Sequence, residues 1–130
     1  MPISYFFDTS VVLKAHTDES SAARSYFDLS SRAARKVTNQ FVLKELRRLP
    51  RTSPELGLVP HEIEELIVDM QMDFEILPTS TPDVFKRLVL VNGADRPIVQ
   101  GAMSAAATLL TRDRRLATEA RAYVQVIKVP

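Results

Sequence analysis

Short apolar runs that are typical of strands buried on both faces are the feature that most constrains the fold of this chain. Ile3–Phe7 is apolar and aromatic along most of its length, and Thr108–Thr111 is a second run of this kind. Neither shows the regular alternation of a strand with one face in water. Continuously apolar strands separated by helical patterns favour a parallel sheet with helices on each side. The sequence therefore predicts an α/β fold with a mostly parallel central sheet.

Predicted strands and helices alternate along nearly the whole chain. The predicted strands are Ile3–Phe7, Val37-Thr38, Phe74–Leu77, Thr108–Thr111 and Val124–Val129. The predicted helices are one that starts at the capping residues Asp8-Thr9-Ser10 and includes Val11–Ala15, then Asp18–Lys36, Asn39–Leu49, His61–Met72, Pro82–Val91, Asp95–Ala106 and Arg114–Ala122. Pro50 is expected to end its helix, and Arg51–Pro60 is expected to be a loop. No repeat or linker divides the chain, so we expect one domain over residues 1–130.

The composition narrows the classes of protein that the chain can belong to. The formal net charge of the 130 residues is +1, so any binding of a polyanion must come from local clusters of Lys and Arg. The absence of cysteine excludes disulfides and thiolate metal sites, and it fits a reducing compartment. We see no signal peptide and no apolar run near the roughly 20 residues that cross a bilayer. These observations predict a cytoplasmic protein with no membrane partner.

Four acidic residues stand where a fold does not readily place charge. Asp8 follows the first buried strand, and Asp113 follows Thr108–Thr111. Ligands of parallel α/β sheets bind beyond the carboxyl ends of such strands. Each of these acids is equally well placed to be an ordinary N-cap of the helix that follows it. Asp95 likewise either caps its helix or faces the protein on the side shared with Ile98 and Ala102.

Glu45 carries the strongest signal of the four, because it lies within an apolar helical stripe. With about 100° per residue, Glu45 falls about 40° from Phe41 and within the arc of Val42 and Leu46. A carboxylate on a core-facing stripe costs several kcal/mol unless it is paired or bound to a metal. The alternative is that Glu45 sits at the edge of the stripe and pairs with a nearby arginine.

If the four acids converge, their mutual repulsion requires a cation. Oxygen ligands without cysteine, and without histidine next to the acids, favour Mg²⁺ or Mn²⁺ over Zn²⁺. Two such ions lower the pKa of a bound water and stabilise a leaving oxygen, which is the chemistry of phosphodiester cleavage. The sequence thus predicts a nuclease that acts through metal-activated water.

Four stretches in register along the chain resemble the PIN-domain ribonucleases. They are FFDTSVVLKAH (Phe6–His16), TNQFVLKELRRL (Thr38–Leu49), ADRPIVQGAMSAAATLLTRD (Ala94–Asp113) and the closing strand VQVIKV. The size of the chain also resembles the stand-alone VapC-type toxins of toxin–antitoxin pairs. The resemblance implies a three-layer α/β/α sandwich, an endoribonuclease that cleaves single-stranded RNA with Mg²⁺ or Mn²⁺, a homodimer and an antitoxin protein as partner.

The resemblance also implies roles for individual residues. The metal-binding and catalytic acids of the family fall on Asp8, Glu45, Asp95 and Asp113, and its hydroxyl residues fall on Ser10 and Thr111. Such hydroxyls orient carboxylates or water. Beyond the family motif, Arg96 and Arg112 lie close in sequence to the proposed ligands, so they are candidates for binding the RNA phosphate. The four basic residues Lys44, Arg47, Arg48 and Arg51 form either a second phosphate-contacting ridge or a solvated helix face.

Two other classes of function are compatible with parts of the sequence. One is a phosphoacceptor signalling domain like the response-regulator receivers, for which Asp8 and Lys128 are superficially suitable. Against it, Asp8 is followed by Thr9-Ser10 instead of a second acid, and Phe74–Leu77 ends in Pro78. The other is a non-catalytic scaffold of the PIN fold that only binds RNA or a protein.

Overall fold

The centre of the molecule is a sheet of five parallel strands, seen in a computed structural model that describes residues 3–79 and 82–130. The strands are β1 (Ile3–Phe7), β2 (Ala34–Asn39), β3 (Glu75–Leu77), β4 (Thr108–Thr111) and β5 (Val126–Lys128). Their order across the sheet is β3-β2-β1-β4-β5, and every neighbouring pair is parallel. Strands β2 and β3 therefore lie on one side of β1, and the later strands β4 and β5 lie on its other side.

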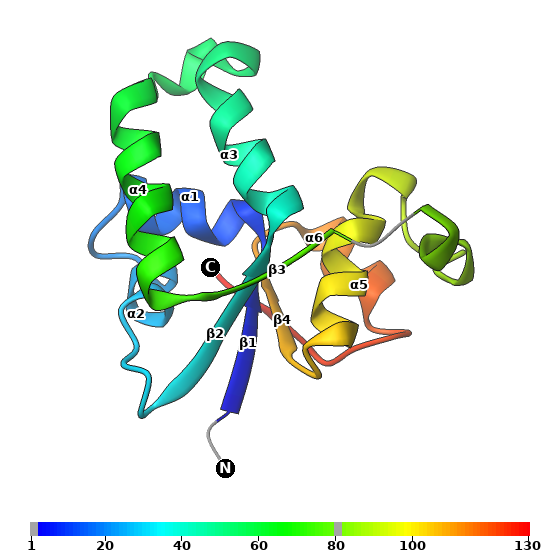
Figure 1. The fold of residues 1–130 in the computed structure, drawn as a ribbon. Helices are drawn as coiled ribbons and strands as arrows, with labels where there is room; N and C mark the ends of the chain where they lie inside the picture. The colour runs from blue at the N-terminus through cyan, green and yellow to red at the C-terminus, as the bar shows by residue number, and fades with distance from the viewer. Residues whose placement is uncertain (1–2, 80–81) are drawn as a thin grey trace.

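Helices cover both faces of this sheet and complete a three-layer α/β/α sandwich. They are α1 (Thr9–Thr17), α2 (Ala22–Phe27), α3 (Gln40–Thr52), α4 (Pro60–Asp73), α5 (Arg96–Ser104) and α6 (Arg114–Ala120), with short 3-10 turns η1 (Pro54–Leu56), η2 (Pro82–Arg87) and η3 (Gly93–Asp95). Figure 1 shows α1, α2 and α4 on one side of the sheet and α5 and α6 on the other. This division follows from right-handed crossovers, because the connections on either side of β1 run in opposite directions.

The core lies on both faces of the central strands, as their continuous apolar sequence predicts. Phe6 and Phe7 are both fully buried, and they point to opposite faces. The Phe7 ring meets the edge of the Phe74 ring with 4.9 Å between centroids. On the other face, a Cβ built on Gly101 of α5 would lie 2.5 Å from the Phe6 ring. Only glycine allows α5 to pack this closely against β1.

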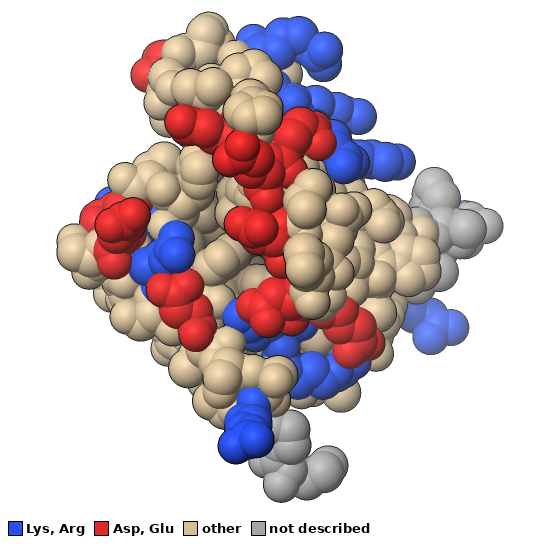
Figure 2. Space-filling model, turned by 60° about the vertical axis from the view of Figure 1, so that its left-hand side comes forward, with Lys and Arg blue, Asp and Glu red and all other residues tan. Residues whose placement is uncertain are grey.

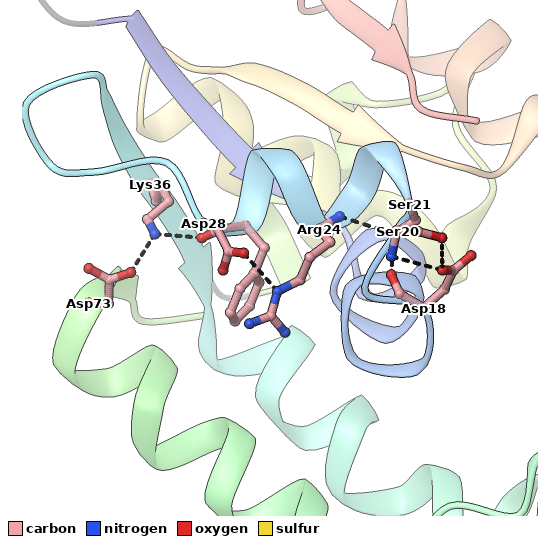
Figure 3. Close-up of polar contacts among 8 residues, drawn as sticks. Asp18, Ser20, Ser21, Arg24, Asp28, Lys36 and Asp73 are labelled. Carbon is pink, nitrogen blue, oxygen red and sulfur yellow. Dashed lines mark hydrogen bonds and ion pairs between the residues drawn. The ribbon is translucent and has the colours of Figure 1, made fainter.

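The predicted helix over Asp18–Lys36 is wrong, because the chain turns twice within it and then forms a strand. Asp18 accepts hydrogen bonds from both the amide and the hydroxyl of Ser20, which makes a turn directly after α1. Ser21 then caps α2 by accepting a bond from the Arg24 amide at 3.1 Å. Figure 3 shows this turn and cap, together with the Arg24–Asp28 pair across the end of α2. Serine and aspartate favour such local bonds over helix continuation.

The rest of that segment is strand β2, which extends the expected Val37-Thr38 to six residues. Its Lys36 is buried, which the sequence alone does not suggest for a lysine. The Lys36 ammonium donates to the Phe27 carbonyl and to the Asp73 carboxylate at the end of α4. Figure 3 shows the pair of Lys36 and Asp73. It also lies 4.9 Å from the centroid of the Phe74 ring. This tertiary pairing overrides the alanine-rich helical pattern.

The other elements occur as predicted with corrections at their ends, except for the predicted helix Pro82–Val91. Helix α3 continues through Pro50 to Thr52, and η1 occupies part of the predicted loop 51–60. The predicted helix Pro82–Val91 is wrong in type, because η2 covers only 82–87 and the next bonds, Leu88 to Phe85 and Val91 to Leu88, span three residues. Asp95 belongs to η3 and precedes α5 instead of lying inside it. None of the helices in the described ranges is long and apolar enough to span a membrane.

Candidate active site

The candidate site lies at the carboxyl ends of β1 and β4, where the strand order changes direction. β1 and β4 are direct neighbours in the sheet. The amide of Asp8 donates to the Leu110 carbonyl at 3.1 Å, so Asp8 continues the line of β1 beside β4. Asp113 follows two residues after β4. Such a switch point is where open α/β sheets bind their ligands, since the two connections leave in opposite directions and open a crevice.

Asp8 is buried and is held by hydroxyl groups. Its Oδ2 accepts hydrogen bonds from Ser10 Oγ and from Thr111 Oγ1, both at 2.7 Å. Burial raises the pKa of the Asp8 carboxyl, the two hydroxyl bonds oppose this shift, and the charge of Asp113 adds to it. Asp8 occupies the N-cap position of α1, but its side chain makes no capping bond there, and its bond to α1 comes from the Ser10 hydroxyl. Its side chain is therefore held by hydroxyl groups and does not act as an ordinary helix cap.

The same two hydroxyl groups tie Asp8 to the turn that carries Asp113. Thr111 Oγ1 accepts a hydrogen bond from the Asp113 amide at 3.1 Å, and Ser10 Oγ accepts one from the Arg112 amide at 3.0 Å. Each hydroxyl thus donates to the Asp8 carboxylate and accepts from the turn between β4 and α6. Thr111 is fully buried, so its bond to Asp8 is shielded from water, whereas the bond from the Arg112 amide to Ser10 is exposed.

Glu45 reaches the same pocket from α3. Its Oε1 accepts a hydrogen bond from Thr9 Oγ1 at 2.8 Å, and the side chain is partly buried. Burial is the main cause that raises the pKa of Glu45; the Thr9 bond lowers it, while the charges of Asp8 and Asp95 raise it further. The predicted alternative, a glutamate paired with an arginine, is present only as a weak influence of Arg48 on this pKa.

Asp95 lies at the start of α5 and makes no side-chain cap bond there. The pKa of its carboxyl is raised to about 6, first by burial and then by the charges of Asp8, Asp113 and Glu119, with Arg115 opposing them. Burial and the three neighbouring acids thus outweigh Arg115 and favour the neutral form of this carboxyl. The close packing of Gly101 against Phe6 sets the position of α5 and hence of Asp95 over the sheet.

Asp113 is both an N-cap and a member of the acidic group. Its Oδ1 accepts hydrogen bonds from the Arg115 amide at 2.9 Å and the Leu116 amide at 3.1 Å, at the start of α6. The alternative of a helix cap, open for three of the acids, thus holds for Asp113 and not for Asp8 or Asp95. The charge of Asp113 still acts on both of those residues.

The four acids act on one another through their charges, and several of their carboxylate oxygens accept no hydrogen bond. Within the described part of the chain, Glu45 Oε2, Asp113 Oδ2 and both oxygens of Asp95 accept no hydrogen bond. As the side chains lie, no group of three or more histidine, aspartate or glutamate residues among 3–79 and 82–130 is arranged to hold a metal ion. The chemistry of the donor set nevertheless fits a hard divalent cation, because it consists of carboxylate oxygens that repel one another.

The two arginines predicted to bind phosphate have different surroundings. Arg96 Nε donates to the Val91 carbonyl at 3.1 Å, which ties its side chain to its own loop. Arg112 is exposed, and its Nε donates to the Pro130 carbonyl at 3.2 Å. Arg112 also lines a cavity of about 410 Å³ with Lys14, Leu13 and residues of the turn before α4. Of the two, Arg112 is the better placed to meet a substrate.

In the hairpin of α3 and α4, the exposed charged side chains of one helix are mostly basic and those of the other are acidic. The basic residues of α3 are all exposed: Lys44, Arg47, Arg48 and Arg51. The acidic residues of α4 are also all exposed: Glu62, Glu64, Glu65, Asp69 and Asp73. Figure 2 shows acidic side chains in a column down the face that bears α4, with basic side chains projecting beside its upper part. Arg47 and Glu64 join the two helices at 3.1 Å, so part of the basic ridge is used within the molecule.

Three residues that support the acids were not predicted as part of the site. Thr9 holds Glu45. Asn39 caps α3 through the Val42 amide, and its Nδ2 donates to the Pro97 carbonyl at 3.0 Å, which joins α3 to α5. Glu119 accepts from the Asn92 amide in the loop before Asp95. Only Thr9 carries a sequence signal, since it directly follows Asp8.

Comparison with known proteins gives consistent results. A family model described as PIN domain matches residues 5–121. DNA-bound VapBC from Salmonella typhimurium is similar with a TM-score of 0.71 at 17% identity, over 96% of this chain and 97% of that one. VapBC2 from Rickettsia felis, bound to a DNA fragment from its promoter, gives 0.68 at 16% identity, over 96% and 98%. FitAcB from Neisseria gonorrhoeae gives 0.62 at 18% identity, over 95% and 96%. At these identities the structures show a shared fold; among curated proteins nothing matches.

Proposed function

Because the chain belongs to the PIN domain family, we propose that it is a metal-dependent endoribonuclease that cleaves single-stranded RNA. PIN domains are generally nucleases, and the acidic pocket at the strand-order switch supports that activity here. Membership of this family leaves the phosphoacceptor alternative without support. We also propose that residues 1–130 act as one PIN-like domain.

The observation that carries the proposal is an excess of negative charge, because four acids close to the carboxyl ends of β1 and β4 act on one another through their charges. Among the described residues, no lysine or arginine forms an ion pair with Asp8, Glu45, Asp95 or Asp113. The pKa values of Asp8, Glu45 and Asp95 are all raised, which means that the pocket stabilises the neutral acids relative to the carboxylates. A divalent cation would reverse this balance and favour the charged forms.

In this proposal Asp8, Glu45, Asp95 and Asp113 would hold Mg²⁺ or Mn²⁺. Such an ion, when bound, activates water as a nucleophile and stabilises the leaving oxygen of a phosphodiester. The residues of the chain do the positioning. Ser10 and Thr111 fix the Asp8 carboxylate through its Oδ2, and Thr9 fixes Glu45 through its Oε1. These hydroxyl bonds keep the carboxylates oriented while they lack a cation.

The RNA would approach from the side where basic residues flank the pocket. Arg112 directly follows Thr111, and Arg48 lies one helical turn from Glu45 on α3. We propose that Arg112 and the exposed part of the α3 ridge contact phosphates next to the cleaved bond. Arg96 is a weaker candidate, because its Nε is already bonded within its loop. Binding of RNA requires local clusters of Lys and Arg, because the net charge of the chain is only +1.

We further propose a protein partner. VapBC2 and the Salmonella VapBC are named as complexes bound to DNA, and this chain shares their fold over 96% of its length. By that likeness, and by the resemblance of its sequence to VapC-type toxins, the chain would be the toxin of a toxin–antitoxin pair. It would form a homodimer in the cytoplasm and bind an antitoxin protein.

A cleavage assay tests the proposed function. Purified protein is incubated with a single-stranded RNA oligonucleotide and with total RNA, in Mn²⁺, in Mg²⁺ and in EDTA. We expect cleavage with either ion and none in EDTA. Asp8→Asn should remove the activity, whereas Asp69→Asn, an exposed acid of α4, should leave it unchanged. Cleavage that survives both EDTA and Asp8→Asn contradicts the mechanism, and RNA binding without cleavage in either metal supports a non-catalytic scaffold instead.

A further inference from the structure

Asp95 differs from the other three acids because no side chain or amide holds its carboxylate. Asp8, Glu45 and Asp113 each accept a hydrogen bond from a hydroxyl or a backbone amide. Asp95 accepts none within the described chain, and it makes no cap bond to α5. Its carboxylate is therefore placed by the backbone of η3 alone. Whatever anchors that backbone determines where Asp95 stands in the pocket.

The anchor of this backbone is Glu119, a residue of α6. Glu119 Oε1 accepts a hydrogen bond from the Asn92 amide at 2.9 Å. Asn92 in turn holds η3 at two points, because its Oδ1 accepts from the Ala94 amide at 3.1 Å and its carbonyl accepts from the Asp95 amide at 2.9 Å. Glu119 thus acts on Asp95 through a single intervening residue.

Glu119 is itself held in place, which makes it suitable as an anchor. Its Oε2 accepts a hydrogen bond from Arg115 Nε at 3.0 Å, and its side chain is only 22% exposed. Tyr123, just after α6, adds a second tie by accepting a bond from the Leu90 amide at 3.1 Å. The loop before Asp95 is therefore attached to the α6 region at two places.

The first residues of α6 are bonded to Asp113, a second acid of the pocket. Asp113 caps the helix through the Arg115 and Leu116 amides, and Glu119 follows one turn later on the same short helix. Helix α6 therefore begins at Asp113 and, through Glu119, anchors the loop that carries Asp95. The separation of Asp95 and Asp113 is set by the geometry of α6, although the two residues belong to different loops.

We propose that Glu119 is a positioning residue that holds Asp95 at the distance from Asp113 required to bind a divalent cation. It acts by accepting the Asn92 amide and not as a ligand, and we expect this bond to matter more for metal binding than the charge that Glu119 also exerts on Asp95. The proposal rests on the proposed function only for the part that makes Asp95 a metal ligand.

Two substitutions of Glu119 distinguish the effect of its hydrogen bond from the effect of its charge. Glu119→Ala removes both the acceptor for the Asn92 amide and the charge, whereas Glu119→Gln removes the charge and keeps the acceptor oxygen. Mn²⁺ binding is titrated by electron paramagnetic resonance, without RNA. We expect Glu119→Ala to weaken Mn²⁺ binding about tenfold or more, the size of effect typical for residues that orient metal ligands. Glu119→Gln should stay close to the unmodified protein.

Hydrogen exchange of the metal-free protein supplies a second readout. Exchange of the Asn92 and Asp95 amides should be faster in Glu119→Ala and nearly unchanged in Glu119→Gln. Ile67→Val, a cavity-forming change in α4, controls for general loss of stability and should affect neither the Mn²⁺ titration nor exchange in this loop.

The possible failures of the two proposals can be told apart. Equal loss of Mn²⁺ binding in both Glu119 variants, or unchanged binding in Glu119→Ala, overturns the positioning role. If the unmodified protein binds no Mn²⁺, the proposed function fails and Asp95 is no longer a ligand. Exchange of the Asn92 and Asp95 amides then decides the remaining claim, and unaltered exchange in Glu119→Ala overturns it.

Discussion

Two buried charged residues of opposite sign lie on adjacent strands and have very different surroundings. The Lys36 side chain on β2 is 2% exposed, and its ammonium is matched by the Asp73 carboxylate, the Phe27 carbonyl and the face of Phe74. Asp8 at the end of β1 is 5% exposed. Its partners within the described chain are hydroxyl groups and an amide, and the charge that acts on its pKa is that of another acid, Asp113.

This difference separates a structural charge from a functional one. A buried charge costs several kcal/mol unless it is paired, and the surroundings of Lys36 provide that pairing within the protein. The surroundings of Asp8 provide hydrogen bonds but no ion pair among the described residues, and burial together with neighbouring acids raises the pKa values of Asp8, Glu45 and Asp95. A fold that keeps such an excess of negative charge is suited to a ligand of positive charge. The following predictions test this contrast, beginning with the largest expected effect.

Asp8→Asn should abolish catalysis without harming the fold. Loss of a residue next to a metal ligand typically costs 10–100-fold in activity, so loss of a proposed ligand should lower the cleavage rate at least about a hundredfold. The midpoint of thermal unfolding should stay the same or rise, because the substitution removes a buried charge that has no opposite charge beside it. Initial rates on an RNA oligonucleotide and thermal unfolding check the two parts. A clear drop in the unfolding midpoint with unchanged cleavage would make Asp8 structural, like Lys36.

Thr111→Val should weaken the site by a smaller factor. The valine keeps the volume of the side chain but removes the hydroxyl that joins the Asp8 carboxylate to the Asp113 amide. We expect metal affinity to fall about 10–100-fold, as measured by Mn²⁺ titration. Thr108→Val, at the opposite end of the same strand, is the matched control and should leave the affinity unchanged.

Lys36→Met should affect stability and leave the site intact. The methionine fills much of the same space but cannot bond the Phe27 carbonyl or pair with Asp73. The free energy of unfolding should fall by about 1–3 kcal/mol, the cost of losing hydrogen bonds to a charged group. Denaturant unfolding measures this change, and a Mn²⁺ titration should match that of the unmodified protein. Loss of Mn²⁺ binding in this variant would contradict the distinction between Lys36 as a structural charge and Asp8 as a functional one.

The pH dependence of stability should reveal the excess negative charge of the pocket. The pKa of Asp95 is about 6 in the folded protein, above its ordinary value of 3.8, so the folded state binds the proton more tightly. Its contribution to stability is therefore fully present below pH 3.8 and is lost as the pH rises through 6. The difference in unfolding free energy between the unmodified protein and Asp95→Asn, measured without metal, should change in this window and be flat above it. Added Mn²⁺ should restore stability mainly above pH 6.

Local patterns predicted most of the sheet, and they also indicated four acids whose role as a site stays a prediction. The largest failure occurred where local turns and a distant residue together decide the structure. The apolar runs at Ile3–Phe7 and Thr108–Thr111 form strands because their own side chains fill both faces of the sheet. The predicted helix Asp18–Lys36 failed because Asp73, 37 residues away from Lys36, stabilises a strand there. Glu45 was detectable since its charge contradicts the helical stripe that contains it.

The supporting residues of the site were less accessible to sequence reasoning. Ser10 and Thr111 were located through the family resemblance, and the structure places both against Asp8. Glu119 had no signal of any kind, because its partner Asn92 is 27 residues away and the bond involves a backbone amide. Side chains that accept hydrogen bonds from distant backbone amides depend on tertiary packing and leave no pattern of residue types along the chain.

Anomalous diffraction from crystals soaked in MnCl₂ tests the central claim most directly, because the chain offers Mn²⁺ two acidic regions. The pocket contains Asp8, Asp95 and Asp113 with Glu45, and the outer face of α4 contains acids that are exposed to solvent. We expect an anomalous peak bonded to carboxylate oxygens of Asp8 and at least one other acid of the pocket. Peaks confined to the exposed acids of α4, with none at Asp8, would contradict the account.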